Sequence, residues 1–243
     1  MLEHLTASQY VAMGVTVLVG ACFQGIAGIG FSIVAAPVCA LLFPELVPGP
    51  LLLLGLPLST MGWWREGRDV LWDIGVVALV GRLAGAALAA ALLLCLSARM
   101  IGVVFALCVL AAVACSGAGW RLSASRRNVA LAGIASGVMS TVTSAGGPPF
   151  AIVMQQLPPA ALRATLSCIF TIGTVISLAA LYGLGSLGTS GLGLAALLLP
   201  WLLAGFAIST RLMRRISHAG IRQVLLAFAA FSAIGVLVQA WIG

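Results

Sequence analysis

The sequence predicts an all-α polytopic membrane protein made of two inverted repeats, each a broken, re-entrant helical hairpin plus three transmembrane helices. Two observations lead to this fold class. First, 62% of the 243 residues are hydrophobic and only 7% are charged, whereas a soluble domain carries about 25% charged residues. Second, apolar runs alternate with short breaks rich in Gly, Pro or Arg, and the same order of long and short runs occurs twice. This composition excludes intrinsic disorder, a collagen-like chain and a nucleic-acid-binding module.

The first half of the chain contains five predicted helices, each an apolar run that ends at a residue able to interrupt a helix. We place them at 10–27, 31–43, 50–64, 71–95 and 98–116. The most hydrophilic stretch of the chain, SGAGWRLSASRRN at 116–128, follows them. This stretch therefore separates the two halves as a linker.

The second half repeats the order of the first, with predicted helices at 129–145, 148–157, 160–183, 190–210 and 218–242. Single residues recur as well: Gly20 and Gly30 match Gly137 and Gly147 at an offset of 117, and Leu83 and Gly85 match Leu203 and Gly205 at an offset of 120. We therefore expect a first transmembrane repeat at 1–116, a cytoplasmic linker at 117–128 and a second transmembrane repeat at 129–243.

Two of the predicted helices are shorter than the hydrocarbon core of a bilayer. The segments 31–43 and 148–157 reach about 20 Å and about 15 Å, against a hydrocarbon core of about 30 Å. Each follows a glycine-rich break, GIAGIGFS at 25–32 or TSAGGPPF at 143–150. We interpret each short helix and its predecessor as an interrupted hairpin, and leave open whether the short helices are re-entrant or cross fully.

The charges predict the orientation of these helices. The chain has 12 basic residues, all Arg, and five acidic residues. Because each half has an odd number of helices, the halves run in opposite orientations. With the linker in the cytoplasm, ten of the 12 arginines also lie inside, in agreement with the positive-inside rule, and both termini lie outside. These ten are Arg65, Arg68, Arg121, Arg126, Arg127, Arg163, Arg211, Arg214, Arg215 and Arg222.

The two breaks are candidate anion sites. A helix that begins inside a membrane leaves backbone N–H groups unpaired and carries a partial positive charge at its start. Inverted repeats point two such ends at each other near the bilayer midplane. Ser32 is the expected N-cap of the first short helix. The alternative is that Gly and Pro only permit close helix packing. The backbone candidates are Gly28, Gly30, Ser32, Gly146, Gly147 and Pro148.

Arg82 is the charged residue expected deepest in the membrane, near the middle of the helix at 71–95. Such a charge is costly and is a functional candidate by default, and no acidic residue lies at the same depth to pair with it. A substrate anion is one counter-ion; a structural role with backbone carbonyls is the other. Gln24, Thr143 and Ser144, together with Ser140 and Thr141, flank the breaks and either bind an oxyanion or satisfy the backbone there.

No enzyme signature is present. The sequence lacks HExxH, GxSxG and a Walker-type loop. The six cysteines fall inside apolar runs without CxxC spacing, so they are interpreted as core residues. We therefore expect no catalytic residue, metal or cofactor.

The break segments GIAGIGFSIVAAP and SGVMSTVTSAGGPPFAIV resemble the duplicated signature of the TauE/SafE family of sulfite exporters and sulfonate-uptake permeases. The resemblance extends from about Tyr10 to Trp241. Gly146-Gly147-Pro148 fits this signature better than the first copy, which has Gly-Ile-Gly where relatives often have three glycines. The resemblance implies transport of sulfite, sulfoacetate or a similar small anion across a bacterial inner membrane.

Together these features predict a secondary transporter that moves a small anion by alternating access. Export is favoured, because each negative charge that leaves an inside-negative cell gains about 2.3 kcal/mol per 100 mV. Three alternatives stay open: an anion channel, a sulfonate uptake permease coupled to a cation, and a membrane enzyme or accessory subunit with thiol chemistry at Cys22. The expected partners are a small anion and the lipid bilayer, with a homodimer left open and no nucleic acid.

Overall fold

A computed structural model describes residues 6–95, 122–185 and 189–213, together with the single positions 100, 103, 107, 110 and 234. Within these ranges the regular elements are all helical. The expected helices at 98–116 and 218–242, and the first part of the linker, lie outside the described residues. An all-helical fold is therefore confirmed for the described part of the chain.

Eight α-helices and two short 3-10 helices make up this described part. They are α1 (Ala7–Ala27), α2 (Gly30–Leu42), η2 (Pro44–Leu46), α3 (Gly49–Glu66), η3 (Gly67–Asp69), α4 (Trp72–Cys95), α6 (Arg126–Thr143), α7 (Pro148–Val153), α8 (Pro159–Gly183) and α9 (Thr189–Leu212). Most bounds agree with the expected segments to within three residues. The exception is α7, which ends at Val153 although 157 was expected; a turn follows it, and Pro158 and Pro159 oppose continuation of the helix.

Local sequence signals start these helices. Thr6 caps α1 by accepting a hydrogen bond from the Gln9 N–H, and the Gln9 side chain caps Thr6 in return, which forms a capping box. Ser125 caps α6 through the N–H of Asn128. Prolines occupy the first turns of α7 and α8, where a missing N–H costs nothing. The starts of α1, α6, α7 and α8 are therefore specified by short-range chemistry.

The expectation for Ser32 is wrong. The N-cap of α2 is Ile29, and the helix already begins at Gly30, so Ser32 lies inside the first turn. The reason is that the Gln24 side chain, from the preceding helix, accepts the N–H of Phe31 at 3.1 Å. A side chain seven residues earlier thus supplies the cap that the sequence assigned to Ser32.

Within the described ranges, four helices are long and apolar enough to cross a membrane: Ala7–Ala27, Trp72–Cys95, Pro159–Gly183 and Gly191–Leu212. Their outer faces carry large apolar side chains. On α4, Val76, Val80 and Leu83 are 53%, 65% and 57% exposed, while Arg82 on the same helix is 1% exposed. This distribution, apolar outside and polar inside, suits a lipid environment.

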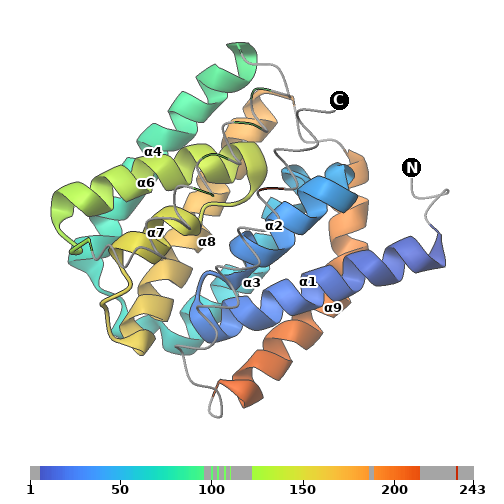
Figure 1. The fold of residues 1–243 in the computed structure, drawn as a ribbon, viewed down its shortest axis with the longest axis horizontal. Helices are drawn as coiled ribbons and strands as arrows, with labels where there is room; N and C mark the ends of the chain where they lie inside the picture. The colour runs from blue at the N-terminus through green and yellow to red at the C-terminus, as the bar shows by residue number, and fades with distance from the viewer. Residues whose placement is uncertain are drawn as a thin grey trace.

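Two glycine-lined helix pairs flank a central pair (Figure 1). On one side lie α4 and α6. A Cβ added at Gly81 would meet Gly133, and one added at Gly85, a turn later, would meet Ile134 and Gly137, so the contacts advance along both helices and the two run in the same direction. On the other side, α1 and α9 also run in the same direction, with Gly14 against Trp201 and Gly205 against Leu18. Between the two pairs, α3 packs against α8. Small residues allow both outer pairs to approach at backbone distance.

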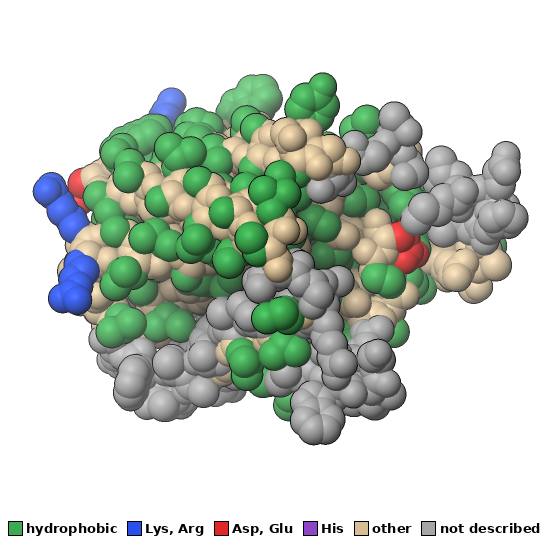
Figure 2. Space-filling model, turned by 90° about the horizontal axis from the view of Figure 1, so that it is seen from above, with side chains coloured by type: hydrophobic (Ala, Val, Ile, Leu, Met, Phe, Trp, Pro, Cys, Tyr) green, Lys and Arg blue, Asp and Glu red, His purple; other side chains and the backbone are tan. Residues whose placement is uncertain are grey.

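Arginines gather at one end of this bundle. At the end of α3, Glu66 pairs with Arg163 near the start of α8, and Arg65 contacts Thr210 near the end of α9. In Figure 2 the basic side chains in view lie toward one end, and apolar side chains cover much of the visible face. The exposed arginines near the helix ends are Arg68, Arg126, Arg127 and Arg211.

Candidate functional site

The first break joins α1 to α2 by a tight turn at Gly28. Gly28 has a φ of 83°, in the left-handed region that favours glycine, and its N–H donates to the Gln24 carbonyl at 2.8 Å. The Gln24 side chain then bridges the break: Nε2 donates to the Gly28 carbonyl at 2.8 Å, while Oε1 accepts from Phe31. The polar groups of this break therefore satisfy one another.

Three charged residues support the first break from the arginine-rich end of the bundle. Arg65 donates from Nη2 to the Gly25 carbonyl at 2.6 Å, near the end of α1. Arg163 lies against Gly28: a Cβ added at Gly28 would be 3.3 Å from the Arg163 Cα. Glu66 accepts two hydrogen bonds from Arg163 Nε and one from Nη2, at 2.9 to 3.1 Å. This cluster ties α1, α3 and α8 together at one end of the molecule.

The second break joins α6 to α7 with the same backbone geometry. Ser144 takes the left-handed position with a φ of 62°, and its N–H donates to the Ser140 carbonyl at 2.9 Å. Its hydroxyl donates to the Pro48 carbonyl at 2.7 Å, next to the start of α3. Gly147 is the N-cap of α7, and Pro148 is its first residue. With only six residues, α7 has a small dipole, and its start is a weak source of positive charge.

Arg82 supplies a full positive charge beside this second break. Its Nη1 donates to the Ser136 hydroxyl at 2.7 Å, and its Nη2 donates to the Ser140 hydroxyl at 3.0 Å. Ser136 in turn donates to the Gly146 carbonyl at 2.6 Å. The guanidinium carbon lies 5.5 Å from the centre of the Phe170 ring. Arg82 therefore connects α4 to the break through two serines of α6.

No acidic group balances Arg82 within the described residues. Arg82 forms no ion pair with a described residue, and its Nε has no hydrogen-bond partner among them. Asp73, on the same helix, is nine residues away, which is about 13 Å along the helix axis. A buried cation without a counter-ion is costly, since removing charge from water needs compensation. Arg82 is thus a buried cation that is held by two serine hydroxyls and has no ion pair among the described residues.

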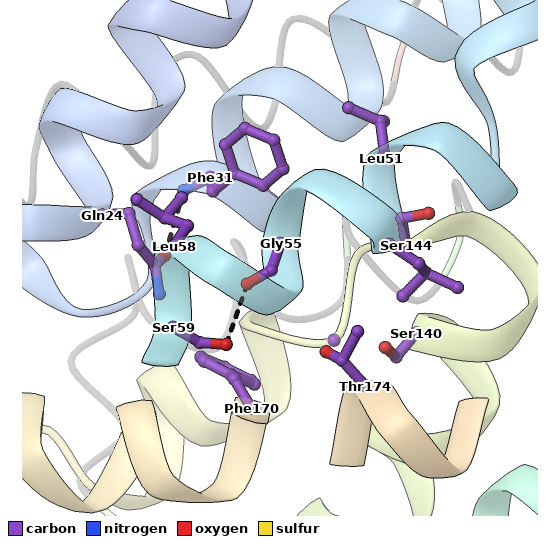
Figure 3. A pocket seen from close by; sticks show the side chains of 12 residues that line it. Gln24, Phe31, Leu51, Gly55, Leu58, Ser59, Ser140, Ser144, Phe170 and Thr174 are labelled. Atoms are coloured by element: carbon purple, nitrogen blue, oxygen red, sulfur yellow. Dashed lines mark hydrogen bonds between the residues drawn. The ribbon is translucent and has the colours of Figure 1, made fainter. Parts of the chain in front are cut away.

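A small cavity lies where the two breaks approach α3 and α8 (Figure 3). Gln24 and Phe31 line it from the first break, and Ser140, Ser144 and Gly146 line it from the second. Its volume is about 40 Å³, which is room for about three water molecules or one compact oxyanion. The cavity is therefore formed by segments that are 116 residues apart in the chain, as counted from Gln24 to Ser140.

Two helices that the sequence did not single out complete the cavity. From α3 come Ser59 and the apolar Leu51 and Leu58; from α8 come Phe170 and Thr174. The sequence held a signal for α8, because Ser167, Thr171, Thr174 and Ser177 form a polar stripe at three- and four-residue spacing in an apolar helix. For α3 the side of the helix that faces the cavity is set by packing against α8.

The structure places the expected site residues in three groups. Gln24, Ser144 and Gly146 line the cavity, and Arg82 lies directly behind its Ser140 wall. Gly28, Gly30, Gly147 and Pro148 shape the two breaks without lining the cavity. Thr143 donates its hydroxyl to the Met139 carbonyl of its own helix at 2.7 Å. The Ser32 side chain lies outside the described part of the structure.

Comparison with known proteins identifies the chain at the level of the family. A family model described as "Sulfite exporter TauE/SafE" matches residues 12–236. The match includes both breaks, Arg82 and every residue that lines the cavity. Searches of curated proteins and of solved structures found no significant match.

Proposed function

The chain belongs to the TauE/SafE family of sulfite exporters, a family of membrane transporters, and from this premise we propose that it exports sulfite or a similar small organosulfur anion by alternating access. The anion binds in the cavity between the two breaks. The observation that carries the proposal is Arg82: a buried cation, unpaired among the described residues, at the wall of a cavity sized for one compact anion.

The pattern of helix contacts supports two inverted repeats. In this division α1 to α4 of the first repeat correspond in order to α6 to α9 of the second. The contact between α1 and α9 then corresponds to the contact between α6 and α4. The contact between α3 and α8 corresponds to itself. Both outer pairs pack through glycine, with Gly85 against the Ile134 carbonyl and Gly205 against the Leu18 carbonyl. Gly85 and Gly205 are the residues that match at an offset of 120. We accordingly keep the division into repeats at 1–116 and 129–243.

Alternating access follows from this arrangement. Each outer pair combines one helix from each repeat, so a rotation of the pairs against the central α3 and α8 would expose the cavity to one side and then to the other. The gathering of arginines at one end supports a cytoplasmic location for that end, with both termini outside the inner membrane.

Export is the favoured direction. An anion that leaves an inside-negative cell gains about 2.3 kcal/mol per charge and 100 mV. Among the described acids, Glu45, Glu66, Asp69 and Asp73 lie at or near helix ends, where none is placed to relay protons through the middle of the membrane. A sulfonate uptake permease coupled to a cation needs such a group or a sodium site.

Flux in proteoliposomes tests the proposal. Vesicles loaded with labelled sulfite should lose it at a rate that saturates with internal concentration, rises with an inside-negative potential, and is stimulated by unlabelled sulfite outside. The last effect requires a carrier, because a channel shows no counterflow. Flux that never saturates and shows no counterflow would establish the anion channel instead, and absence of flux for sulfite and sulfoacetate would remove the proposed substrates.

Labelling tests the orientation. Ser123 is exposed just before α6. A single cysteine at this position should react with an impermeant maleimide only after the cytoplasmic side is opened. Reaction in intact cells would invert the proposed topology.

A further inference from the structure

Four hydroxyl groups line the central cavity, and they differ in what their hydrogens do. Ser59 donates to the Gly55 carbonyl at 2.8 Å, and Ser144 donates to the Pro48 carbonyl at 2.7 Å. Ser140 accepts from Arg82, but its own hydrogen has no acceptor in the described part of the chain. Thr174 is 5% exposed and its hydroxyl has no partner there at all. Two hydroxyl hydrogens are therefore available to whatever occupies the cavity (Figure 3).

Arg82 is held where it acts on one of these two hydroxyls. Ser136 accepts from Nη1, and the absence of a side chain at Gly173 leaves space for the guanidinium, since a Cβ there would meet Arg82 Nε. Arg82 does not itself line the cavity. A hydroxyl that accepts a hydrogen bond from a cation becomes a stronger hydrogen-bond donor. Arg82 therefore strengthens the hydrogen bond that Ser140 can donate into the cavity.

The remaining lining restricts the charge of the occupant. Leu51, Leu52 and Leu58 and the rings of Phe31 and Phe170 form much of the wall. One buried positive charge neutralises one negative charge. A second negative charge would be desolvated without a partner in this apolar surrounding, which is unfavourable.

We infer that Ser140 and Thr174 donate their hydroxyl hydrogens to a singly charged, compact oxyanion in this cavity, with Arg82 as the positioning residue behind Ser140. The inference rests on the proposed function, because it names the donors and the charge state at that same site. Hydrogensulfite, the monoanion of sulfite, and methanesulfonate belong to this class. Sulfate and the sulfite dianion do not.

Matched anions test the charge state. Methanesulfonate and sulfate share a tetrahedral sulfur with at least three oxygens, but carry one and two negative charges. In thermal unfolding of the purified protein at constant ionic strength, methanesulfonate should raise the unfolding temperature and bind at least about tenfold more tightly than sulfate, because the second negative charge of sulfate would be desolvated without a partner. Equal or tighter binding of sulfate would overturn the inference.

Hydroxyl variants test the donors. Ser140→Ala and Thr174→Val should each weaken methanesulfonate binding by about tenfold or more, whereas Thr174→Ser retains it. Ser177→Ala is the matched control, because this buried serine lies one turn further along α8, outside the cavity, with its hydroxyl bonded to Thr141. Unchanged binding in both Ser140→Ala and Thr174→Val would overturn the assignment.

The charge preference separates positioning by Arg82 from a merely structural role. Arg82→Gln should bind both anions weakly and without preference, whereas Arg82→Lys should keep the preference for the monoanion at lower affinity. A preserved preference in Arg82→Gln would contradict the role of Arg82. Sulfite flux separates a failure of the donor assignment from a failure of the proposed function. If the wild-type protein transports sulfite and the Ser140→Ala and Thr174→Val variants still do, only the donor assignment is wrong. If the wild-type protein neither transports nor binds sulfite, the proposed function is wrong as well.

Discussion

The two broken hairpins have the same backbone and different side-chain chemistry. Gly28 and Ser144 both end a helix in the left-handed conformation, 116 residues apart. In the first break, the Gln24 side chain pairs with backbone groups of the break itself, whereas in the second break Arg82 of α4 donates to the serines beside the break. At the offset of 120 that matches Gly85 with Gly205, the counterpart of Arg82 is the buried Leu202. The same backbone geometry therefore has only neutral hydrogen-bonding groups in the first break and a buried positive charge beside the second.

The largest expected effect falls on the first break. Gly30→Ala places a Cβ against the backbone of Phe23 and Gln24, which cannot move aside as a side chain can. We expect a loss of about 3 kcal/mol or more in unfolding free energy, measured as a fall in the thermal unfolding temperature and in the yield of monodisperse protein.

Gly183→Ala is the control for this variant, because a Cβ at that position meets nothing within 4 Å. Wild-type stability in Gly30→Ala would show that the first break is looser than its contacts indicate. It would contradict the structural role that we assign to the first break.

The ionic support of the first break should rank second. Glu66→Gln leaves Arg163 and the nearby Arg65 without their shared carboxylate. Both partners of the Arg163 pair are about 10% exposed, so we expect a loss of about 2–3 kcal/mol, measured by thermal unfolding. Anion binding by the folded fraction should stay unchanged, because Glu66 does not line the cavity.

The double variant Glu66→Gln with Arg163→Gln should recover part of this loss, since it removes the uncompensated charge along with the carboxylate. If the double variant is as unstable as the sum of the two single variants, the pair acts independently and the ionic explanation is wrong.

Only part of the two breaks and of the cavity could be predicted from the sequence. The breaks at 28 and 144 were predictable because glycine-rich segments interrupt otherwise continuous apolar runs. The partners of Arg82 were not, because Ser136 and Ser140 reach it only through the crossing of α4 and α6. Gly81 and Gly85 facing Gly133 and Gly137 are the available signal for that crossing. For Thr174 the polar stripe of α8 indicates the face of the helix, but it does not indicate which of the stripe's residues meets a cavity.

The second break should respond in function more than in stability. A Cβ at Gly146 would lie 2.9 Å from Arg82 Nη1, Ser136 Oγ and Ser140 Cβ. The first two atoms are ends of side chains that can shift, whereas Ser140 Cβ is fixed by its backbone. For Gly146→Ala we expect a stability loss of about 1–2 kcal/mol. The sulfite concentration for half-maximal flux should rise about tenfold, because displacement of Arg82 weakens the charged hydrogen bonds at the cavity.

Gly75→Ala on α4 provides the control, since its nearest neighbour is the Thr165 Cγ2 at 4.0 Å. A Gly146→Ala variant that loses stability as severely as Gly30→Ala, with unchanged flux in its folded fraction, would make the two breaks equivalent and contradict the division of roles.

The smallest expected effect concerns Cys22, the residue on which a membrane enzyme with thiol chemistry would depend. Cys22 lies on α1 before the first break, half-buried, and it does not line the cavity. Cys22→Ala should therefore leave sulfite flux within about twofold of wild type, since substitutions away from special features change free energies by less than about 0.5 kcal/mol. Cys95→Ala, at an exposed position near the end of α4, is the control for a general effect of thiol removal. Loss of flux in Cys22→Ala alone would bring thiol chemistry to the first break, and the break that looks purely structural would then carry the reaction.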